Sequence, residues 1–330
     1  MIYLAIHKII AGEPKYRQNQ IFRYLLQEHI SDWQEATTLP MTLRHQLSID
    51  FPLTIAAQLI KAKNQAVSKA KIQLADGHSI ETVLLMHTDG RVTVCVSTQC
   101  GCPAGCVFCA TGRMGFVRNL QAEEIILQLL FWSRQIKKDG QRITNVVFMG
   151  MGDPFLNIEQ VYQALSIFND PQYFNIAARK ISLSTVGIIA GIKKMASDPR
   201  QFNLAISLHA PNDRIRNKLI PMNKKYNISK ILSAVQDYIK RTNRQVMFEY
   251  LLIDGINDDE YCAQQLAQLM DNNLYVVNLI PYNDTDLFRA SSKKNIMAFR
   301  HTLEKQGIKV TQRYSFGADI DSACGQLVGN

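Results

Sequence analysis

The chain lacks long apolar runs, the pattern of a signal peptide in its opening residues, and internal repetition. No stretch approaches the about 20 consecutive apolar residues of a membrane-spanning helix. The opening MIYLAIHK has neither a basic segment before its apolar stretch nor a small-residue cleavage site after it. We therefore expect no signal peptide and no membrane association, and place the protein in the cytoplasm. Without repeats of fixed period or low-complexity segments, solenoid and fibrous architectures are excluded.

Cysteine is also scarce, with 7 among 330 residues, and an odd count in a long chain argues against a disulfide framework. Three of the seven nevertheless lie close together, at Cys102, Cys106 and Cys109. Three thiolates at this C-x3-C-x2-C spacing can hold three irons of a 4Fe–4S cluster and leave the fourth iron without a protein ligand. With Phe108 before the last cysteine, the pattern resembles the signature of radical SAM enzymes, whose open iron binds and reduces S-adenosylmethionine (SAM).

A structural zinc site is the alternative reading of the same cysteines. Zinc takes four ligands in a closed tetrahedron, and Cys100 could supply the fourth thiolate. However, the step from Cys100 to Cys102 is too short for paired zinc knuckles, and no second pair of Cys or His lies within zinc-finger distance.

Basic residues exceed acidic ones by 37 to 28, for a net charge of +9. The excess is gathered in four sequence clusters, which are Lys61, Lys63, Lys69 and Lys71; Arg214, Arg216, Lys218, Lys224 and Lys225; Lys240, Arg241 and Arg244; and Lys293 and Lys294. Such clusters favour a polyanionic partner, because phosphate contacts supply most non-specific affinity for nucleic acid. The charge alone leaves a nucleic-acid partner and an incidentally basic surface equally open.

From about residue 92 onward, short apolar runs typical of strands alternate with amphipathic runs typical of helices. The expected strands are 92–96, 145–149, 180–184, 203–208, 245–252, 275–280 and 309–314, and the expected helices are 122–137, 159–168, 229–240, 259–270 and 293–306. Asn157, Ser229 and Asp258 are the candidate helix caps. This alternation implies parallel strands with right-handed crossovers. Six or so repeats predict an α/β fold, a partial (β/α)6 barrel with its chemistry at the C-terminal strand ends.

The residues before this region have a different character. Helices are expected at 16–29 and 41–49, so that residues 1–60 form a small helical domain. Residues 61–91 carry short alternating runs at 66–74 and 79–86, which predict a β-extension or linker leading into the barrel at 92–330.

Polar motifs follow several of the predicted strands. These motifs are MGMGDP at 149–154, SLSTVG at 182–187, SLH at 207–209 and PYN at 281–283. Glycines in the first motif let a ligand approach the backbone closely, and the acid at Asp153 can meet a ligand ammonium group. Four such motifs after consecutive strands indicate a binding site at one edge of the sheet.

Two cysteines outside the trio are candidate functional residues. Cys95 precedes Cys102 by seven residues, and Cys324 lies near the C-terminus among small and polar residues, which predicts an accessible, mobile position. Taken singly, each would more often be an inert buried thiol. Cys262, on the apolar face of a helix, is expected in the core, and Cys100 in the core or packed behind the cluster.

Together these residues resemble the radical SAM RNA adenine methyltransferases of the RlmN/Cfr family. The matching stretches cover nearly the whole chain and are 95–120, 149–154, 204–213, 280–283 and 319–329, with Tyr16-Arg17 and Leu43-Arg44 near the start. The resemblance implies a 4Fe–4S cluster on Cys102, Cys106 and Cys109, and SAM as second cofactor. It also implies methylation of carbon 2 or carbon 8 of an adenine, which is too electron-poor for ordinary methyl transfer and needs a radical route.

The resemblance assigns roles to further residues. Cys324 would take a methyl group from one SAM, and a 5′-deoxyadenosyl radical from a second SAM would remove hydrogen from this S-methylcysteine so that the carbon adds to adenine. Cys95 would release the adduct by removing a proton and forming a Cys95–Cys324 disulfide, and Glu81 matches the family's proton acceptor. The implied SAM contacts are Gly152, Asp153, Ser184, Ser207, Leu208, His209 and Asn283.

The chain departs from the family pattern at two of these positions. Asp153 stands where the family usually has glutamate, and its side chain is one methylene shorter. Tyr282 stands where the housekeeping branch commonly has tryptophan.

We expect carbon 2 of an adenine in 23S rRNA to be the target, with tRNA as a further substrate. The first alternative is a carbon-8 enzyme that confers antibiotic resistance, which Gln99-Cys100-Gly101 and the EPKYR segment at 13–17 resemble, whereas Pro281 resembles the housekeeping branch. The second is a non-catalytic, zinc-stabilised RNA-binding protein. An enzyme must unstack its adenine, and we expect the N-terminal domain and basic clusters to hold the RNA. We also expect an external electron donor such as a flavodoxin, and a monomer.

Overall fold

The computed structural model describes residues 6, 9–64, 66–283, 287–313 and 320–329. Its centre is a ten-stranded sheet in the order β1-β2-β3-β4-β7-β8-β9-β10-β11-β12. Its strands are β1 (Ala57–Lys61), β2 (Val67–Gln73), β3 (Ser79–Met86), β4 (Val92–Cys95), β7 (Asn145–Phe148), β8 (Ile181–Thr185), β9 (Asn203–Ser207), β10 (Val246–Leu252), β11 (Tyr275–Pro281) and β12 (Lys309–Gln312). Strands β4 to β12 pair in parallel, and β1 to β4 pair antiparallel.

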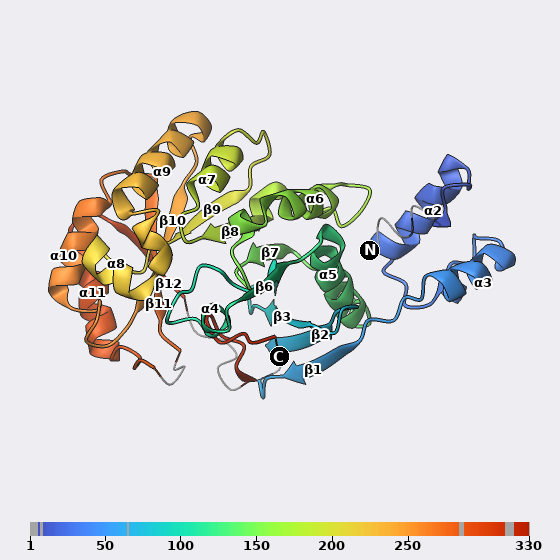
Figure 1. The fold of residues 1–330 in the computed structure, drawn as a ribbon, viewed down its shortest axis with the longest axis horizontal. Coiled ribbons are helices and arrows are strands. Elements are labelled where there is room, and N and C mark those ends of the chain that lie inside the picture. The colour runs from blue at the N-terminus through green and yellow to red at the C-terminus, as the bar shows by residue number, and fades with distance from the viewer. Residues whose placement is uncertain (1–5, 7–8, 65, 284–286, 314–319, 330) are drawn as a thin grey trace.

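Helices connect the parallel strands and cover the outer side of the sheet (Figure 1). They are α5 (Ala122–Lys137), α6 (Ile158–Asn169), α7 (Ile189–Ala196), α8 (Asp213–Leu219), α9 (Ile228–Thr242), α10 (Glu260–Leu269) and α11 (Lys293–Lys305). Six strand–helix repeats are therefore followed by β12, and no pairing between β12 and β1 closes the sheet in the described part of the chain. The expected partial (β/α)6 barrel is confirmed. None of the described helices is long and apolar enough to span a bilayer.

Helix α9 shows how the sequence specifies these elements. Ile231, Val235 and Tyr238 recur at helical spacing and are buried against the sheet, which is the pattern of an amphipathic helix. The helix begins one residue after Asn227, whose side chain accepts a hydrogen bond from a backbone N–H in the first turn. Asn243, in the left-handed region at φ 50°, ends it.

The predicted caps are correct for one helix and displaced for two. Asn157 precedes α6, although its amide bonds the carbonyls of Thr98 and Leu120 instead of the helix. Asn227, not Ser229, caps α9, and Asp259, not Asp258, caps α10. The two displaced predictions chose a polar residue one or two positions from the true cap, because Ser, Asn and Asp are all good caps.

Three short strands were missing from the sequence prediction. β5 (Gln99–Gly101) and β6 (Phe116–Asn119) form a separate hairpin on either side of the cysteine loop. Each is too short to show an alternating pattern. β1 crosses the expected domain boundary at residue 60, and every one of its residues is exposed, so it has no buried face to reveal it. Tyr314, at the end of the predicted strand 309–314, and Asp319 lie outside the described residues.

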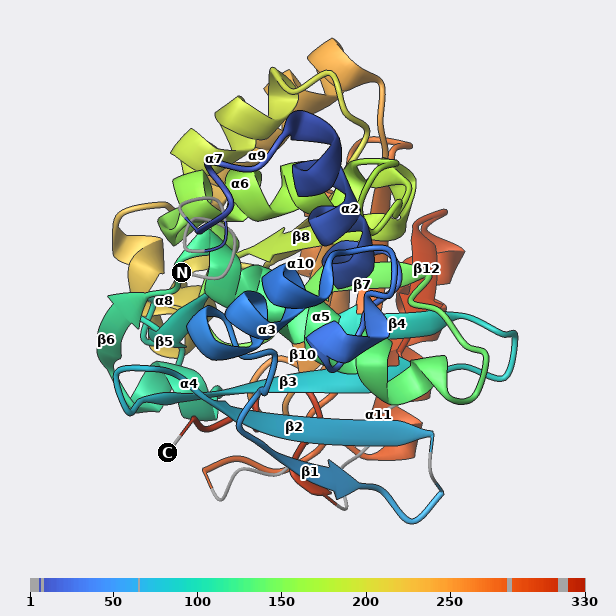
Figure 2. The ribbon, with the colours of Figure 1, turned by 90° about the vertical axis from the view of Figure 1, so that its right-hand side faces the viewer.

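The N-terminal part carries α2 (Lys15–Leu26) and α3 (Met41–Asp50), close to the predicted helices. Its own core includes Trp33, which is 1% exposed and donates from Nε1 to the Phe51 carbonyl at 2.7 Å. Side chains of α5 fasten it to the barrel, since Arg134 and Lys137 donate to the carbonyls of Leu53 and Glu28, each at 2.6 Å. Figure 2 shows α2 and α3 in the foreground, with β1 to β3 following one another at the sheet edge.

Candidate active site

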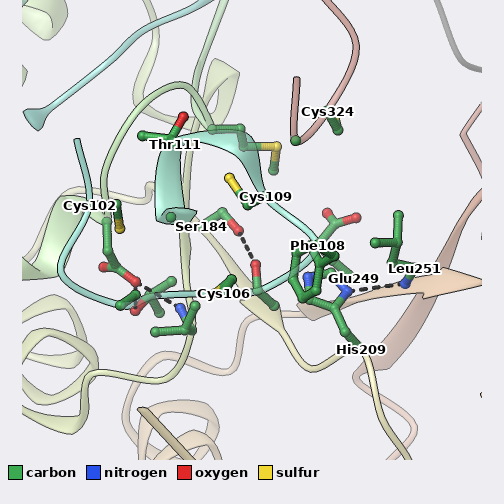
Figure 3. Close-up of a pocket in the computed structure, with 18 of the residues that line it drawn as sticks. Cys102, Cys106, Phe108, Cys109, Thr111, Ser184, His209, Glu249, Leu251 and Cys324 are labelled. Carbon is green, nitrogen blue, oxygen red and sulfur yellow. Dashed lines mark hydrogen bonds between the residues drawn. The ribbon is translucent and has the colours of Figure 1, made fainter. Parts of the chain in front are cut away.

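A partly open cavity lies at the C-terminal ends of the parallel strands (Figure 3). Together with the solvent at its mouth, the space amounts to about 890 Å³. Its lining comes from the cysteine loop, the ends of β7 to β10, Arg313 and the C-terminal segment. A second hollow of about 730 Å³ shares Cys109, Arg313 and Cys324 with the first. We call the two the SAM cavity and the thiol hollow.

Cys102, Cys106 and Cys109 lie on one loop and line the SAM cavity. Burial raises the pKa of the Cys102 thiol to about 12, and burial together with the other two thiols raises that of Cys106 well above its usual value. Three thiols gathered in this way stay protonated unless they bind a metal centre, because coordination to a metal deprotonates a thiol outright. The donor set therefore fits a 4Fe–4S cluster, with one thiolate for each of three irons.

The arrangement does not suit a single zinc ion. Cys100 is 3% exposed, lies on β5 opposite Arg118 and does not line the SAM cavity. Tetrahedral zinc also needs thiolates about 3.8 Å apart, and no group of three or more His, Cys, Asp or Glu side chains within the described ranges could hold one metal ion. Cys262 is buried on α10, as expected for a core residue.

Gly150 and Gly152 of the MGMGDP turn line the SAM cavity, as a close approach of a ligand would need, and they also pack closely against another protein segment. A Cβ on Gly150 would lie 2.7 Å from the Val96 carbonyl oxygen, and one on Gly152 would lie 2.6 Å from the Gln99 side chain. Gly152 also has φ +94°, a conformation that side-chain-bearing residues rarely adopt. These glycines therefore also let the turn pack against residues 96–99.

Asp153 is 4% exposed and lines the SAM cavity, yet its oxygens are already engaged. One accepts from the Phe155 N–H at 2.9 Å, and the other from Val186 N–H at 2.8 Å and Thr185 Oγ1 at 2.9 Å. Burial raises its pKa to about 6 despite these bonds. The shorter acid thus fastens the turn to the end of β8, which leaves it less free than a glutamate to reach a ligand ammonium.

The ends of β8 and β9 supply the hydroxyls of Ser184 and Ser207, which lie 3.2 Å apart in the SAM cavity. Next to them, His209 packs edge-on against Phe108 with ring centroids 4.9 Å apart, and its Nδ1 accepts from Leu251 N–H at 3.1 Å. Burial lowers the pKa of His209 to about 3, so the ring is neutral and carries its proton on Nε2.

Two implied SAM contacts lie elsewhere. Leu208 is fully buried and does not line either space. Its carbonyl accepts from Arg216 Nε at 3.0 Å. Asn283 lines the thiol hollow, where its amide donates to the Cys324 carbonyl at 3.4 Å.

Arg216 was assigned to a basic surface cluster, and this prediction is wrong. Its side chain is 0% exposed and donates to the carbonyls of Val186 at 2.7 Å, Ser207 at 3.1 Å and Leu208 at 3.0 Å, and to Asn223 Oδ1 at 2.6 Å. It thus joins the ends of β8 and β9 beneath the SAM cavity. Sequence spacing gave no sign of this, because arginines on a helix are usually solvated.

Cys324 lines both the SAM cavity and the thiol hollow and is exposed, as expected. Its Sγ accepts a hydrogen bond from the Arg313 guanidinium at 3.3 Å. Cys95 lines the thiol hollow beside it, and burial, with a contribution from Cys324, raises the pKa of Cys95 to about 12. The structure therefore brings together two cysteines that are 229 positions apart in the sequence, as the resemblance implied.

Two residues of the SAM cavity were not predicted from the sequence, and one predicted carboxylate lies outside the cavity. Arg313 and Glu249 line the SAM cavity, and no motif in the sequence pointed to either. Glu81, expected as a proton acceptor, is 4% exposed and lines neither space. It forms an ion pair with Lys69 at 3.1 Å, and Lys69, predicted as part of a basic surface cluster, is itself buried.

Six parallel strand–helix repeats, with three thiols after the first strand facing a cavity at the strand ends, define a radical SAM protein. The model of the Radical SAM superfamily matches residues 96–263. The crystal structure of a radical SAM methyltransferase from Sphaerobacter thermophilus is similar along nearly the entire length, with a TM-score of 0.94 and 41% identity, covering 99% of this chain and 97% of that one.

Two curated relatives narrow the class. One is the probable dual-specificity RNA methyltransferase RlmN of Caldicellulosiruptor saccharolyticus, 44% identical over 319 residues that cover 96% of this chain and 91% of the relative. The other is the ribosomal RNA large subunit methyltransferase N of Nitrosopumilus maritimus, 39% identical over 326 residues that cover 96% and 93%. The chain belongs to the RlmN family of radical SAM RNA methyltransferases. It is an enzyme whose cofactors are a 4Fe–4S cluster and SAM.

Proposed function

We propose that this enzyme methylates carbon 2 of an adenine in 23S rRNA, and in tRNA as a further substrate, with Cys324 as the carrier of the methyl group. The observation that carries the proposal is the thiol hollow, where Cys95 and Cys324 meet beside the cluster-loop residue Cys109. A non-catalytic RNA-binding protein would have no use for two additional thiols beside the cysteine loop. The names of the relatives, a dual-specificity RNA methyltransferase and a ribosomal RNA methyltransferase, support the substrate class.

The cysteine trio would hold the cluster, and Ser184, Ser207 and the turn at Asp153 would border the SAM beside it. When bound, the two cofactors supply a one-electron cleavage of SAM that yields a 5′-deoxyadenosyl radical. The reducing electron comes from an external donor, for which a flavodoxin-like protein is the proposed partner. We further propose that the enzyme acts as a monomer in the cytoplasm, where its RNA substrates are found.

Cys324 carries out the first step. The Cys324 thiol would first lose its proton, and the thiolate would attack the methyl carbon that SAM supplies, so that an S–C bond forms on Cys324 and the sulfonium S–C bond breaks. The Arg313 guanidinium, 3.3 Å from Sγ, stabilises negative charge on the sulfur and orients it. Because Cys324 also lines the SAM cavity, the methyl group that it carries lies where hydrogen can be taken from it.

Cys95 completes the reaction after the methyl carbon has become attached to adenine. The hydrogen on the attacked ring carbon would leave as a proton taken by the Cys95 thiolate, and the unpaired electron of the adduct would pass to the cluster. A sulfur–sulfur bond would then form between Cys95 and Cys324 as the bond between Cys324 Sγ and the methyl carbon breaks. The electron pair of that bond would stay on the carbon, which takes up the Cys95 proton. Cellular dithiols would reduce the disulfide before the next turnover.

Cysteine variants test this assignment. Cys95→Ala should accumulate a covalent RNA–protein adduct through Cys324, visible as an RNA-bearing band in denaturing gels that nuclease removes. Cys324→Ala should form no adduct and no methylated RNA, and Cys262→Ala, which alters a buried thiol of α10, should behave as wild type. Normal methylation by both Cys95→Ala and Cys324→Ala would refute the two-cysteine mechanism.

A further inference from the structure

The segment that carries Cys324, residues 320–329, contains no strand or α-helix in its described part. Its position therefore depends on contacts with neighbouring elements, which include the burial of Ala323 and Leu327 as well as hydrogen bonds. On one side it is attached to the short helix α4 (Ala110–Arg113) after the cluster loop, where Ala110 N–H donates to the Gly325 carbonyl at 2.8 Å and Thr111 Oγ1 donates to the Leu327 carbonyl at 2.6 Å. In Figure 1 the dark-red trace of the C-terminal segment runs beside α4.

On the other side the segment lies against β2 and β3, where it covers a buried ion pair. Lys69 Nζ and Glu81 Oε1 are 3.1 Å apart, and their side chains are only 6% and 5% exposed. Each partner has a second bond to the C-terminal segment. Lys69 donates to the Asp321 carbonyl at 3.1 Å, and Glu81 Oε2 accepts from Val328 N–H at 2.8 Å.

The two attachment points lie on either side of Cys324 in the sequence, at Asp321 before it and at Val328 after it. Charged side chains are almost never fully buried unless they are paired, and a buried pair on its own adds little to stability, because desolvation offsets the attraction. Removing one partner, however, leaves the other charge buried without a counter-ion, and the segment above it must then move to admit water.

We infer that Lys69 and Glu81 are positioning residues that hold the Cys324 segment over the SAM cavity and the thiol hollow. The inference rests on the proposed function only in that Cys324 carries the methyl group. Glu81 acts here through the segment, since both of its oxygens are bonded and it lines neither space. Lys69 is therefore as necessary as Glu81, which a role for Glu81 alone as a proton acceptor would not require.

Hydrogen exchange of the full chain, purified anaerobically with its cluster, tests this inference. Lys69→Met and Glu81→Gln should each raise the exchange rate of the segment's amides about tenfold or more, because local opening of the segment becomes easier. Lys69→Arg keeps the charge and should rescue the wild-type rate. Lys61→Met makes the same change at an exposed lysine of β1 and serves as the control.

The same variants should open the thiol hollow, which the segment lines, so alkylation of the partly buried Cys95 by iodoacetamide, measured by peptide mass spectrometry, should accelerate. Alkylation of Cys262, which is buried on α10, serves as reference. Val328→Pro provides an independent variant, because it removes only the N–H that bonds Glu81 and leaves the buried charges in place. Amides of β10 and β11 report whether a variant is folded. Unchanged exchange over 321–328 in Lys69→Met and in Val328→Pro would overturn the inference.

The methylation state of Cys324 in the purified proteins separates this inference from the proposed function. If Cys324 carries a methyl group in wild type but exchange is unaffected by the variants, the positioning role is wrong and the function stands. If Cys324 is unmethylated in every protein while exchange rises as expected, the proposed function fails and the positioning role stands. Both succeed when methylation of Cys324 falls in Lys69→Met and Glu81→Gln and is restored in Lys69→Arg.

Discussion

Arg313 donates to Cys324 Sγ at 3.3 Å and also contacts the Met149 sulfur at 3.5 Å. The Cys324 thiolate and, after it, Glu249 raise the pKa of the guanidinium, so its charge is fixed. The guanidinium therefore places a fixed positive charge next to the sulfur that we propose as the carrier of the methyl group. The sequence named Cys324 but not Arg313, because the arginine belongs to no recognisable motif and reaches the site only through the end of β12.

Arg313→Gln should slow alkylation of Cys324 by iodoacetamide at pH 7 about fivefold, because it removes a charge-assisted hydrogen bond worth roughly 1 kcal/mol at a partly solvated site. Arg313→Lys keeps the charge and should lose less. The rate is measured by peptide mass spectrometry as the alkylated fraction of unmethylated Cys324 over time. Equal rates in wild type and Arg313→Gln would mean that the guanidinium does not activate the sulfur.

The buried ring of His209 determines how the stability of the protein depends on pH. Its folded pKa of about 3 lies below the unfolded value of about 6.5, so the unfolded chain binds a proton that the folded chain refuses. The stability contributed by the neutral ring is complete above pH 6.5 and is lost as the pH falls from there toward 3. At pH 5 the loss amounts to about 2 kcal/mol.

His209→Asn removes this titration and suits the backbone, since residue 209 has φ +55°, a region that Asn tolerates. Urea unfolding at pH 7.5 and pH 5 should show a fall in stability that is about 2 kcal/mol smaller than in wild type. His301→Asn, at an exposed position of α11, should keep the wild-type pH dependence. A wild-type pH dependence in His209→Asn would contradict the assignment.

At the scale of elements, the alternating pattern predicted each parallel strand to within one or two residues, because strands such as β10 and β11 are buried almost throughout and read as continuous apolar runs. The pattern could not reveal β5 and β6, whose form depends on the loop that they enclose. Nor could it reveal that Lys69 and Arg216 lie inside, since the charge of a side chain is visible in sequence and its partners are not.

Arg216 connects the ends of β8 and β9, so its removal should lower the stability of the fold. Arg216→Met leaves the carbonyls of Val186, Ser207 and Leu208 without their donor, at about 1–3 kcal/mol for each buried acceptor. We expect the free energy of unfolding to fall by about 3 kcal/mol or more. Arg214→Met, two positions earlier on α8 and exposed, is the matched control. Urea midpoints that agree between the two variants would show that the network is not needed for stability.

At the scale of the whole molecule, the basic residues outside the core bear on RNA binding. Lys224 and Lys225 are exposed at the end of the 3-10 turn η4 (Pro221–Lys224), next to the cysteine loop. A Cβ on Gly105 of that loop would lie 3.7 Å from Pro221, and Val107 N–H donates to the Leu219 carbonyl at 3.0 Å. A phosphate backbone near the SAM cavity would pass within reach of these two lysines.

Reversing both charges, as Lys224→Glu with Lys225→Glu, should weaken RNA binding and reduce the slope of log affinity against log salt by about 1–2. Lys293→Glu with Lys294→Glu makes an equal charge change at another of the predicted basic clusters, in the first turn of α11, and shows whether the two clusters contribute equally. Fluorescence anisotropy over a range of salt concentrations measures both. An unchanged slope in the first variant would remove Lys224 and Lys225 from the interface.

Nucleoside analysis tests most directly which adenine carbon the enzyme methylates. The chain is expressed in a host that lacks its own carbon-2 enzyme, and nucleosides from rRNA and tRNA are separated chromatographically before mass spectrometry, because the two methyladenosines share a mass. The account predicts 2-methyladenosine in 23S rRNA, dependent on Cys324. 8-Methyladenosine, or neither product from protein shown to carry its cluster, would contradict it.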